Sequence, residues 1–510
     1  PIDYEEDRVD VGLAYTGERL QVELGYSGSW FTNNDSALRW DSAFTNAAWD
    51  VVSPEGQMGL PPDNQAHRIS LSAGYNLGET TRLNGTVSYG WMLQDDDFLP
   101  YTINPAAADV DPTLPRQSLD GKIENLLVDL SASTRPIERL DLRARYRYDD
   151  RNNDTPRDVY LPVHSDTLLQ SSASNEERVN LPYSSTQNLV NLDAGYLLLA
   201  ESSTKLSVGY DFEQKERTFT EVETTRDHTG RVKLQSMPFE SVSGALKYAH
   251  TIRDGSGYVG NVPLLASHVG LPADDFENLP EMRKFHLADR NGDIFGAALT
   301  ILPHEKVTIG LTGNYTMYDY TDGIYGLRDH NIADATVDIS YSPMANVTAY
   351  AFITHERQDF SQDSLQFTSG TVAAALANDP TRRWTAETHD KVNTVGARLE
   401  WNNVADLFDL SLDYSYSKAV TSFDLAGGTA TDTTPLPDLT SRLHSIGVSA
   451  EHHVRENLSV RFGYRFETLS TRDFALDNVD VDTIGLVLAL GQSSPDYTAH
   501  VVGVSLKYQF

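Results

Sequence analysis

Apolar and polar residues alternate with a period of two along many short segments, and this alternation limits the possible folds more than any other feature. In the final segment every second residue is apolar or aromatic: Val502, Val504, Leu506, Tyr508 and Phe510. The residues between them are mostly small or polar. Successive side chains of a β-strand point to opposite faces, so such a segment has one face for lipid and one for water. The pattern predicts an all-β protein.

The polar faces of these segments carry too many charges for the core of a soluble β-sandwich. Asp211 and Glu213 alternate with apolar residues in one segment, and Arg461, Arg465 and Glu467 do so in another. Each segment has about 10 residues, the length with which a tilted strand crosses hydrocarbon. We count about nineteen such strands.

The connections between the segments alternate between tight turns and long stretches rich in Pro, Asp and Asn. The long connections cover residues 33–66, 96–123, 151–187, 254–291, 361–391, 424–442 and 473–498. In outer-membrane β-barrels the short turns face the periplasm and the long loops face outward. We therefore predict a large antiparallel transmembrane β-barrel that forms a single domain over residues 1–510.

Composition excludes several function classes. The 510 residues include no cysteine, which excludes disulfides, thiol catalysis and covalent attachment of c-type haem to this chain. The 73 acidic and 40 basic residues give a net charge of -33, which disfavours binding to nucleic acid. We find no nucleophile motif or metal-ligand pattern, so we predict no catalytic, cofactor-binding or metal-binding residue in this chain and no enzymatic activity.

The end of the chain gives the barrel a direction. Leu506, Tyr508 and the terminal Phe510 resemble the terminal-strand signal by which barrel proteins are recognised for assembly. The final strand should then run toward the periplasm, and counting back places the start of the chain in an external loop. Bacterial single-chain barrels have an even strand number, so about nineteen strands predict that an odd number of N-terminal strands is missing. A miscount near residues 220–235 is the alternative.

Positions predicted to face the lumen are often small, which implies a wide interior. One segment differs, because it places Arg143, Arg145 and Arg147 inward beside Asp141 and Asp149. These arginines either contact an acidic or phosphate-bearing partner or are balanced by the neighbouring aspartates, and we favour the second interpretation. With Asp211, Glu213, Arg461, Arg465 and Glu467, they are the candidate partner-facing residues.

Several loop and strand-end stretches resemble the MtrB/PioB family of outer-membrane proteins that associate with decahaem cytochromes. They are residues 29–34 (SWFTNN) with 37–44 (ALRWDSAF), 146–157 (YRYDDRNNDTPR), 181–188 (LPYSSTQN) and 282–290 (MRKFHLADR). The four stretches occur in the same order as in the family. The chain is shorter than the larger family members and lacks the N-terminal cysteine pair that some of them carry.

The resemblance implies a barrel of about 26 strands in the outer membrane of a Gram-negative bacterium. It also implies partners: a periplasmic decahaem or other multihaem c-type cytochrome in the lumen, often a second multihaem cytochrome outside, and the surrounding lipid bilayer and lipopolysaccharide. The cytochrome would carry the haem, and the barrel would form its sheath in a conduit for extracellular electron transfer. A diffusion porin or substrate-specific channel is the alternative function, and composition does not distinguish the two.

Overall fold

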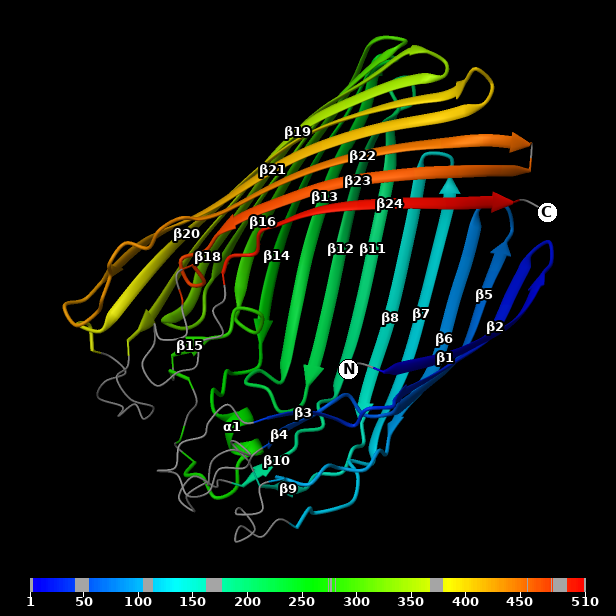
Figure 1. Cartoon of the computed structure of the whole chain (residues 1–510). Coiled ribbons are helices and arrows are strands. Elements are labelled where there is room, and N and C mark those ends of the chain that lie inside the picture. The colour runs from blue at the N-terminus through cyan, green and yellow to red at the C-terminus, as the bar shows by residue number, and fades with distance from the viewer. Residues whose placement is uncertain are drawn as a thin grey trace. The chain divides into compact units, whose positions relative to one another are not determined.

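The computed structural model is drawn in Figure 1. The structure describes residues 3–41, 55–103, 113–161, 177–273, 275, 278–279, 281–366, 379–455, 457–477, 479 and 493–508. Over these residues, it contains no helix with the length and apolarity needed to cross a membrane.

Almost all regular structure in the described residues is β-strand, with a single short helix. The elements are β1 (Tyr4–Thr16), β2 (Leu20–Asn33), β3 (Ala37–Asp41), β4 (Glu55–Gly59), β5 (Asn64–Leu77), β6 (Thr81–Gln94), β7 (Gly121–Ile137), β8 (Leu140–Asn153), β9 (Val159–Tyr160), β10 (Arg178–Val179), β11 (Ser185–Leu199), β12 (Thr204–Arg217), β13 (Thr224–Phe239), β14 (Val242–Gly255), α1 (Val262–Ser267), β15 (Met282–Arg283), β16 (Arg290–His304), β17 (Val307–Tyr320), β18 (Tyr325–Met344), β19 (Val347–Leu365), β20 (Arg383–Val404), β21 (Phe408–Gly427), β22 (Leu439–Arg455), β23 (Leu458–Arg472) and β24 (Tyr497–Tyr508).

Twenty of these strands belong to one hydrogen-bonded sheet. One of them, β15, has only two residues and pairs in parallel with β18, so nineteen long strands remain. Consecutive long strands pair antiparallel wherever a register is defined, as β1 does with β2 and β23 with β24. The predicted number of strands and their antiparallel order are confirmed.

The strands are longer than the predicted 10 residues, and the predicted long loops are correspondingly shorter. The long strands have between 12 and 22 residues, and the longest is β20. The predicted loop 361–391 is wrong at both ends, because β19 continues to Leu365 and β20 begins at Arg383. Three predicted loops also contain regular elements, namely the pair β3–β4, the pair β9–β10, and α1 with β15. Because these segments are rich in polar residues, the alternation pattern did not identify their extended structure.

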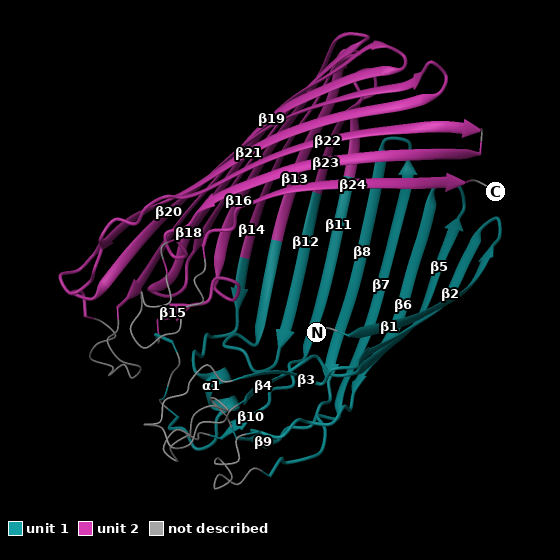
Figure 2. Cartoon of the chain, viewed as in Figure 1, with its two compact units in different colours: residues 1–194, 209–228, 253–280 teal, residues 195–208, 229–252, 281–510 magenta. Residues whose placement is uncertain are grey.

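The chain divides into two compact units, coloured separately in Figure 2. Unit 1 comprises residues 1–194, 209–228 and 253–280, and therefore contains β1 to β10 and α1. Unit 2 comprises residues 195–208, 229–252 and 281–510, and contains β15 to β24. Strands β11 to β14 contribute residues to both units.

Register gives the sheet one apolar and one polar face in each unit, because side chains directly opposite each other on neighbouring strands share a face. In unit 1 an apolar row crosses five strands through Leu13, Leu24, Leu71, Val87 and Val128. One residue away along each strand, a polar row runs through Gly12, Gly25, Ser70, Ser88 and Leu127, with Leu127 as its only large apolar member.

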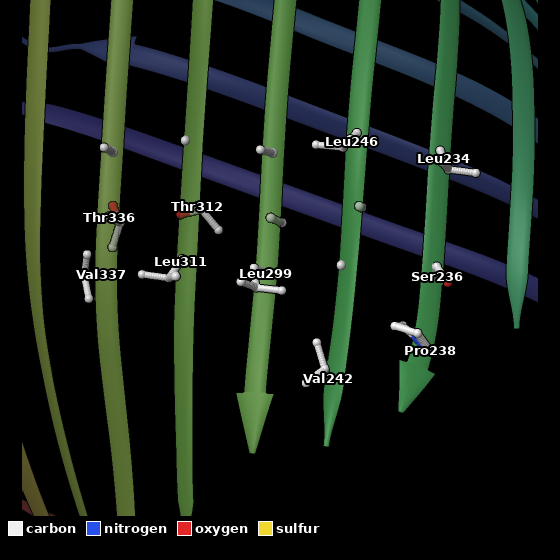
Figure 3. A pocket seen from close by; sticks show the side chains of 16 residues that line it. Leu234, Ser236, Pro238, Val242, Leu246, Leu299, Leu311, Thr312, Thr336 and Val337 are labelled. Carbon is white, nitrogen blue, oxygen red and sulfur yellow. The ribbon is translucent and has the colours of Figure 1, made fainter. Parts of the chain in front are cut away.

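Unit 2 repeats this arrangement. Its apolar row runs through Leu299, Leu311, Val337, Ile353 and Val395. A shallow hollow of about 550 Å³ lies beside Leu299, Leu311 and Val337, and Figure 3 shows that residues from several neighbouring strands surround it. The adjacent polar row includes Thr312, Thr336, Thr354 and Thr394, of which Thr336 and Thr354 are hydrogen-bonded at 2.8 Å.

Tyrosines recur at the same distance from the turn along several strands, on the apolar face of each unit. Six strands that start at a tight turn (β2, β8, β12, β14, β21 and β23) carry a tyrosine six residues after their first residue. Each hydroxyl is hydrogen-bonded, at 2.7–3.2 Å, to a side chain of the next long strand. The pairs are Tyr26–His67, Tyr146–Asn188, Tyr210–His228, Tyr248–Asp293, Tyr414–His444 and Tyr464–His500. Tyrosines at one level, each with a polar partner, are typical of the boundary between hydrocarbon and water.

The connection between β23 and β24 is held by a carboxylate that lies outside the apolar band. Asp477 accepts hydrogen bonds from the backbone N–H groups of Asp473 and Ser494, both at 3.1 Å. Hydrogen bonds from the hydroxyl and backbone of Ser494 hold the pKa of Asp477 below its usual value of 3.8. The ionised carboxylate therefore stabilises this connection at neutral pH.

We expect protection of the Ser494 amide against hydrogen exchange to fall as the pH drops through the lowered pKa of Asp477, at a pH below 3.8. The lowered pKa means that stabilisation is complete well above pH 3.8 and is lost on protonation. The measurement is exchange at Ser494, corrected for the intrinsic pH dependence of exchange. Asp477→Ala, which removes both acceptor oxygens, should lack the protection at every pH, and an unchanged profile in this variant would contradict the assignment.

Candidate functional site

The polar face carries most of the side chains that could contact a partner, and register places the predicted arginines on it. Arg143, Arg145 and Arg147 of β8 lie opposite Ser133, Ser131 and Asp129 of β7. The three arginines therefore share the polar face of the sheet, and their contact with a partner stays a prediction.

The three arginines differ in their ion pairs. Arg145 binds Asp129 through two contacts, one of which joins Nε to Oδ1 at 3.0 Å. Arg147 donates from Nη2 to Asp149 Oδ2 at 2.7 Å. Within the described part of the chain, Arg143 is exposed and has no carboxylate partner. Two of the arginines are thus balanced by aspartates, and Arg143 is left for an external contact.

The predicted carboxylates of β12 are bound by amides of β11. Asn191 Nδ2 donates to Asp211 Oδ1 and Gln187 Nε2 donates to Glu213 Oε1, both at 2.6 Å. Hydrogen bonds to the charged form hold each carboxylate against the sheet. These residues and the β8 arginines all belong to unit 1.

The other predicted partner-facing residues lie on the polar face of β23 in unit 2. Arg461 and Arg465 are exposed and reach the hydroxyls of Ser449 and Ser445, each at 3.4 Å. Glu467 accepts a hydrogen bond from the hydroxyl of Tyr497 on β24. These long contacts leave both guanidinium groups largely available to solvent or to a partner.

A basic hollow on the polar face of unit 1 was not predicted from the sequence. It has a volume of about 580 Å³, and its charged lining comprises Arg8, Arg68, Arg151 and Lys215 together with Glu6 and Asp149. Strand parity puts each of these residues on the polar face, but they come from strands that are far apart in the sequence. Only register could have shown that they line one hollow.

The polar face has low relief at several positions, where long side chains lie across glycines of neighbouring strands. Asp413 lies directly opposite Gly447, and a Cβ atom added to Gly447 would be 2.5 Å from the carboxylate oxygens of Asp413. Asp338 lies over Gly310 in the same way, and the ring of Phe352 lies over Gly396. At these positions the glycine leaves room for the side chain opposite it, and that side chain lies flat against the sheet.

The assembly residues Leu506 and Tyr508 lie on the apolar face of β24, where their exposed fractions are 69% and 51%. They are directly opposite Val460 and Leu458 of β23. Phe510 lies outside the described residues. The role of this segment in assembly stays a prediction.

One group of side chains among the described residues has a geometry that could hold a metal ion: Glu387, His389 and Asp424, whose ligand atoms lie within 4.8 Å of one another. His389 Nδ1 is already 2.5 Å from Asp359 Oδ1, and its Nε2 is 3.5 Å from Asp424. Both ring nitrogens therefore face carboxylates, which is the arrangement of an ion-pair cluster, and we assign no metal to it.

A family model and a known protein both match this chain along its whole length. The model of the outer membrane beta-barrel porin family MtrB/PioB matches residues 1–510. The outer membrane protein MtrB of Shewanella baltica (strain OS185) is 28% identical over 510 residues, which are 100% of this chain and 67% of that protein.

Solved structures with a remote likeness include two siderophore receptors. The ferric enterobactin receptor PfeA of Pseudomonas aeruginosa has a TM-score of 0.47 at 10% identity, covering 99% of this chain and 78% of that one. The receptor PirA of Acinetobacter baumannii has a TM-score of 0.45 at 9% identity, covering 100% and 78%. A likeness this low has no bearing on function.

Proposed function

Because the chain belongs to the MtrB/PioB family of outer-membrane β-barrels, we propose that it encloses a periplasmic multihaem c-type cytochrome and thereby completes a path for electrons across the outer membrane. In a barrel of this kind the apolar face contacts lipid, the polar face lines the lumen, and the tight turns lie in the periplasm. The haem belongs to the partner. The contribution of this chain is to hold the partner and to separate it from the lipid.

The low relief of the polar face is the observation that supports this proposal. Asp413 and Asp338 lie flat over Gly447 and Gly310, so little projects from the wall at these positions. A folded protein packs closely only against a surface of matching shape, because gaps forfeit van der Waals contacts. Polar groups that remain on such a wall can form hydrogen bonds with a partner or with trapped water.

The test is purification of the full chain from its native membrane in mild detergent, followed by a visible spectrum. We expect a Soret band in stoichiometric amount with the barrel, and low ion conductance when the complex is placed in a planar bilayer. A haem-free barrel with a large open conductance would contradict the proposal and favour the diffusion porin or substrate-specific channel.

Arg143 allows a narrower test, because it is the β8 arginine left for an external contact. We expect Arg143→Gln to lower the haem retained per barrel by about fivefold, the effect of roughly 1 kcal/mol in an exposed charge contact. Arg145→Gln is the matched control, since Arg145 already forms an ion pair with Asp129. The measurement is haem absorbance at equal barrel concentration. Equal haem retention by the two variants would show that both arginines only neutralise charge within the barrel wall and do not contact the partner.

A further inference from the structure

Four basic side chains form a continuous row on the apolar, lipid-facing side of unit 2, one on each of the strands β19 to β22. Arg357 lies directly opposite Lys391, and Lys418 lies directly opposite Arg442. Lys391 is opposite Val420, which is two residues from Lys418 on the same face, so the two pairs are diagonal neighbours. We call Arg357, Lys391, Lys418 and Arg442 the basic row.

The basic row is electrostatically unfavourable without a further partner, because like charges directly opposite each other destabilise a sheet. Arg357 binds Asp359, with Nε 2.6 Å from Oδ2. Among the described residues, no carboxylate pairs with Lys391, Lys418 or Arg442. The nearest acidic residues on this face, Asp359, Glu387 and Asp424, lie farther along the strands toward the loops and gather around His389. Positive charge is thus concentrated at one place in a chain whose net charge is -33.

The level of the basic row is fixed by the aromatic boundary beside it. Toward the periplasm, the apolar row that contains Ile353 and Val395 continues to Tyr416, whose ring contacts that of His444 with centroids 4.5 Å apart and planes tilted by 35°. Lys418 and Arg442 are two residues beyond Tyr416 and His444, or about 7 Å at 3.3 Å per residue. That distance beyond the hydrocarbon boundary is the depth of the lipid headgroups.

We propose that the basic row binds the phosphate groups of glycolipid headgroups in the outer leaflet. The row faces the same side as the lipid-contacting residues, so lipid is the neighbour that its position provides. Guanidinium and ammonium groups donate strong hydrogen bonds to phosphate oxygens, and clusters of them at the membrane surface bind anionic headgroups. A bound phosphate would also remove the repulsion within the Lys418–Arg442 pair. This inference concerns the outer surface and does not depend on the proposed function of the lumen.

The test compares lipopolysaccharide binding by the full chain in detergent with binding by Lys418→Gln/Arg442→Gln, using native mass spectrometry. We expect about a fivefold loss of affinity for each charge removed. Arg398→Gln/Lys507→Gln is the matched control, because it removes the same charge from the polar face of β20 and β24. The single variant Lys391→Gln should bind lipopolysaccharide with about fivefold lower affinity, and it provides a second measurement if the double variant folds poorly.

Two further binding experiments identify the ligand. Dephosphorylated lipopolysaccharide should bind the unmodified chain about as weakly as intact lipopolysaccharide binds the double variant. Inorganic phosphate at millimolar concentration should not displace the intact glycolipid, since a free anion lacks the acyl chains that contact the apolar band. Equal binding by the double variant and its control, no effect of dephosphorylation, or displacement by phosphate alone would each overturn the proposal.

Discussion

Leu311→Arg is expected to lower the free energy of unfolding of the barrel by about 2–4 kcal/mol, the cost of an arginine on the lipid face near the bilayer midplane. Leu311 lies on the apolar face of β17, midway between Val307 at the turn and Tyr315 at the level of the aromatic residues. The nine residues from Val307 to Tyr315 cover about 26 Å of strand, or about 20 Å across the membrane at a strand tilt of about 40°. This length is comparable with the apolar band of outer-membrane barrels, about 25 Å.

The matched control for this prediction is the next residue in the chain. Thr312 lies on the polar face, opposite Ala298 and Thr336, and is exposed there. Thr312→Arg should change the free energy of unfolding by less than about 1 kcal/mol, since the guanidinium stays in water. Denaturant unfolding of the refolded barrel in lipid vesicles measures both variants. Equal losses in the free energy of unfolding would mean that the two faces of β17 contact the same environment and not lipid on one side and water on the other.

Much of the fold could be predicted because the side-chain period of a strand is two. Once Leu506 and Tyr508 are assigned to one face, every alternate residue of β24 follows, and the register with β23 confirms it. The direction of the strands follows from the alternation of tight turns and long connections. The side-chain period of a strand and the spacing of turns depend only on residues close together in the chain, so both can be determined from a single sequence.

The turn between β20 and β21 shows what local signals miss. It contains neither glycine nor proline, and Asn403, Ala405 and Asp406 adopt φ values of 53°, 53° and 61°. Asp409 stabilises it by accepting a hydrogen bond from the backbone N–H of Asn403 at 2.7 Å. Asn and Asp tolerate the left-handed region better than other non-glycine residues, which is the signal that could have identified this turn.

The candidate site could be predicted only in part, because contacts on the polar face join strands that are distant in the sequence. Parity puts Arg145 on the polar face, but its partner Asp129 is on the preceding strand and could be identified only from the register. The same limit applies to Lys418 and Arg442. Lys418 follows an apolar segment and Arg442 precedes one, and only the pairing of β21 with β22 shows that they lie opposite each other.

The low relief of the polar face leads to the prediction with the largest expected effect on the proposed function. Gly310→Leu should force Asp338 away from the wall and into the lumen, because the new Cβ would overlap the Asp338 carboxylate. Inserting a large side chain into a close-packed interface typically costs 1–3 kcal/mol. We therefore expect the haem retained per barrel to fall by about tenfold or more.

Gly313→Leu is the matched control, since Gly313 belongs to the same strand but lines the hollow on the apolar face. A Cβ at this position has as its nearest atom the backbone oxygen of Asp334 at 3.4 Å, so the leucine fits with little adjustment. Both substitutions remove a strand glycine, and effects of backbone entropy are therefore shared between them. Heat-modifiable electrophoretic mobility establishes that each barrel is folded, and haem absorbance then measures the partner. If Gly310→Leu retains as much haem as Gly313→Leu, no folded partner packs against the wall at Gly310.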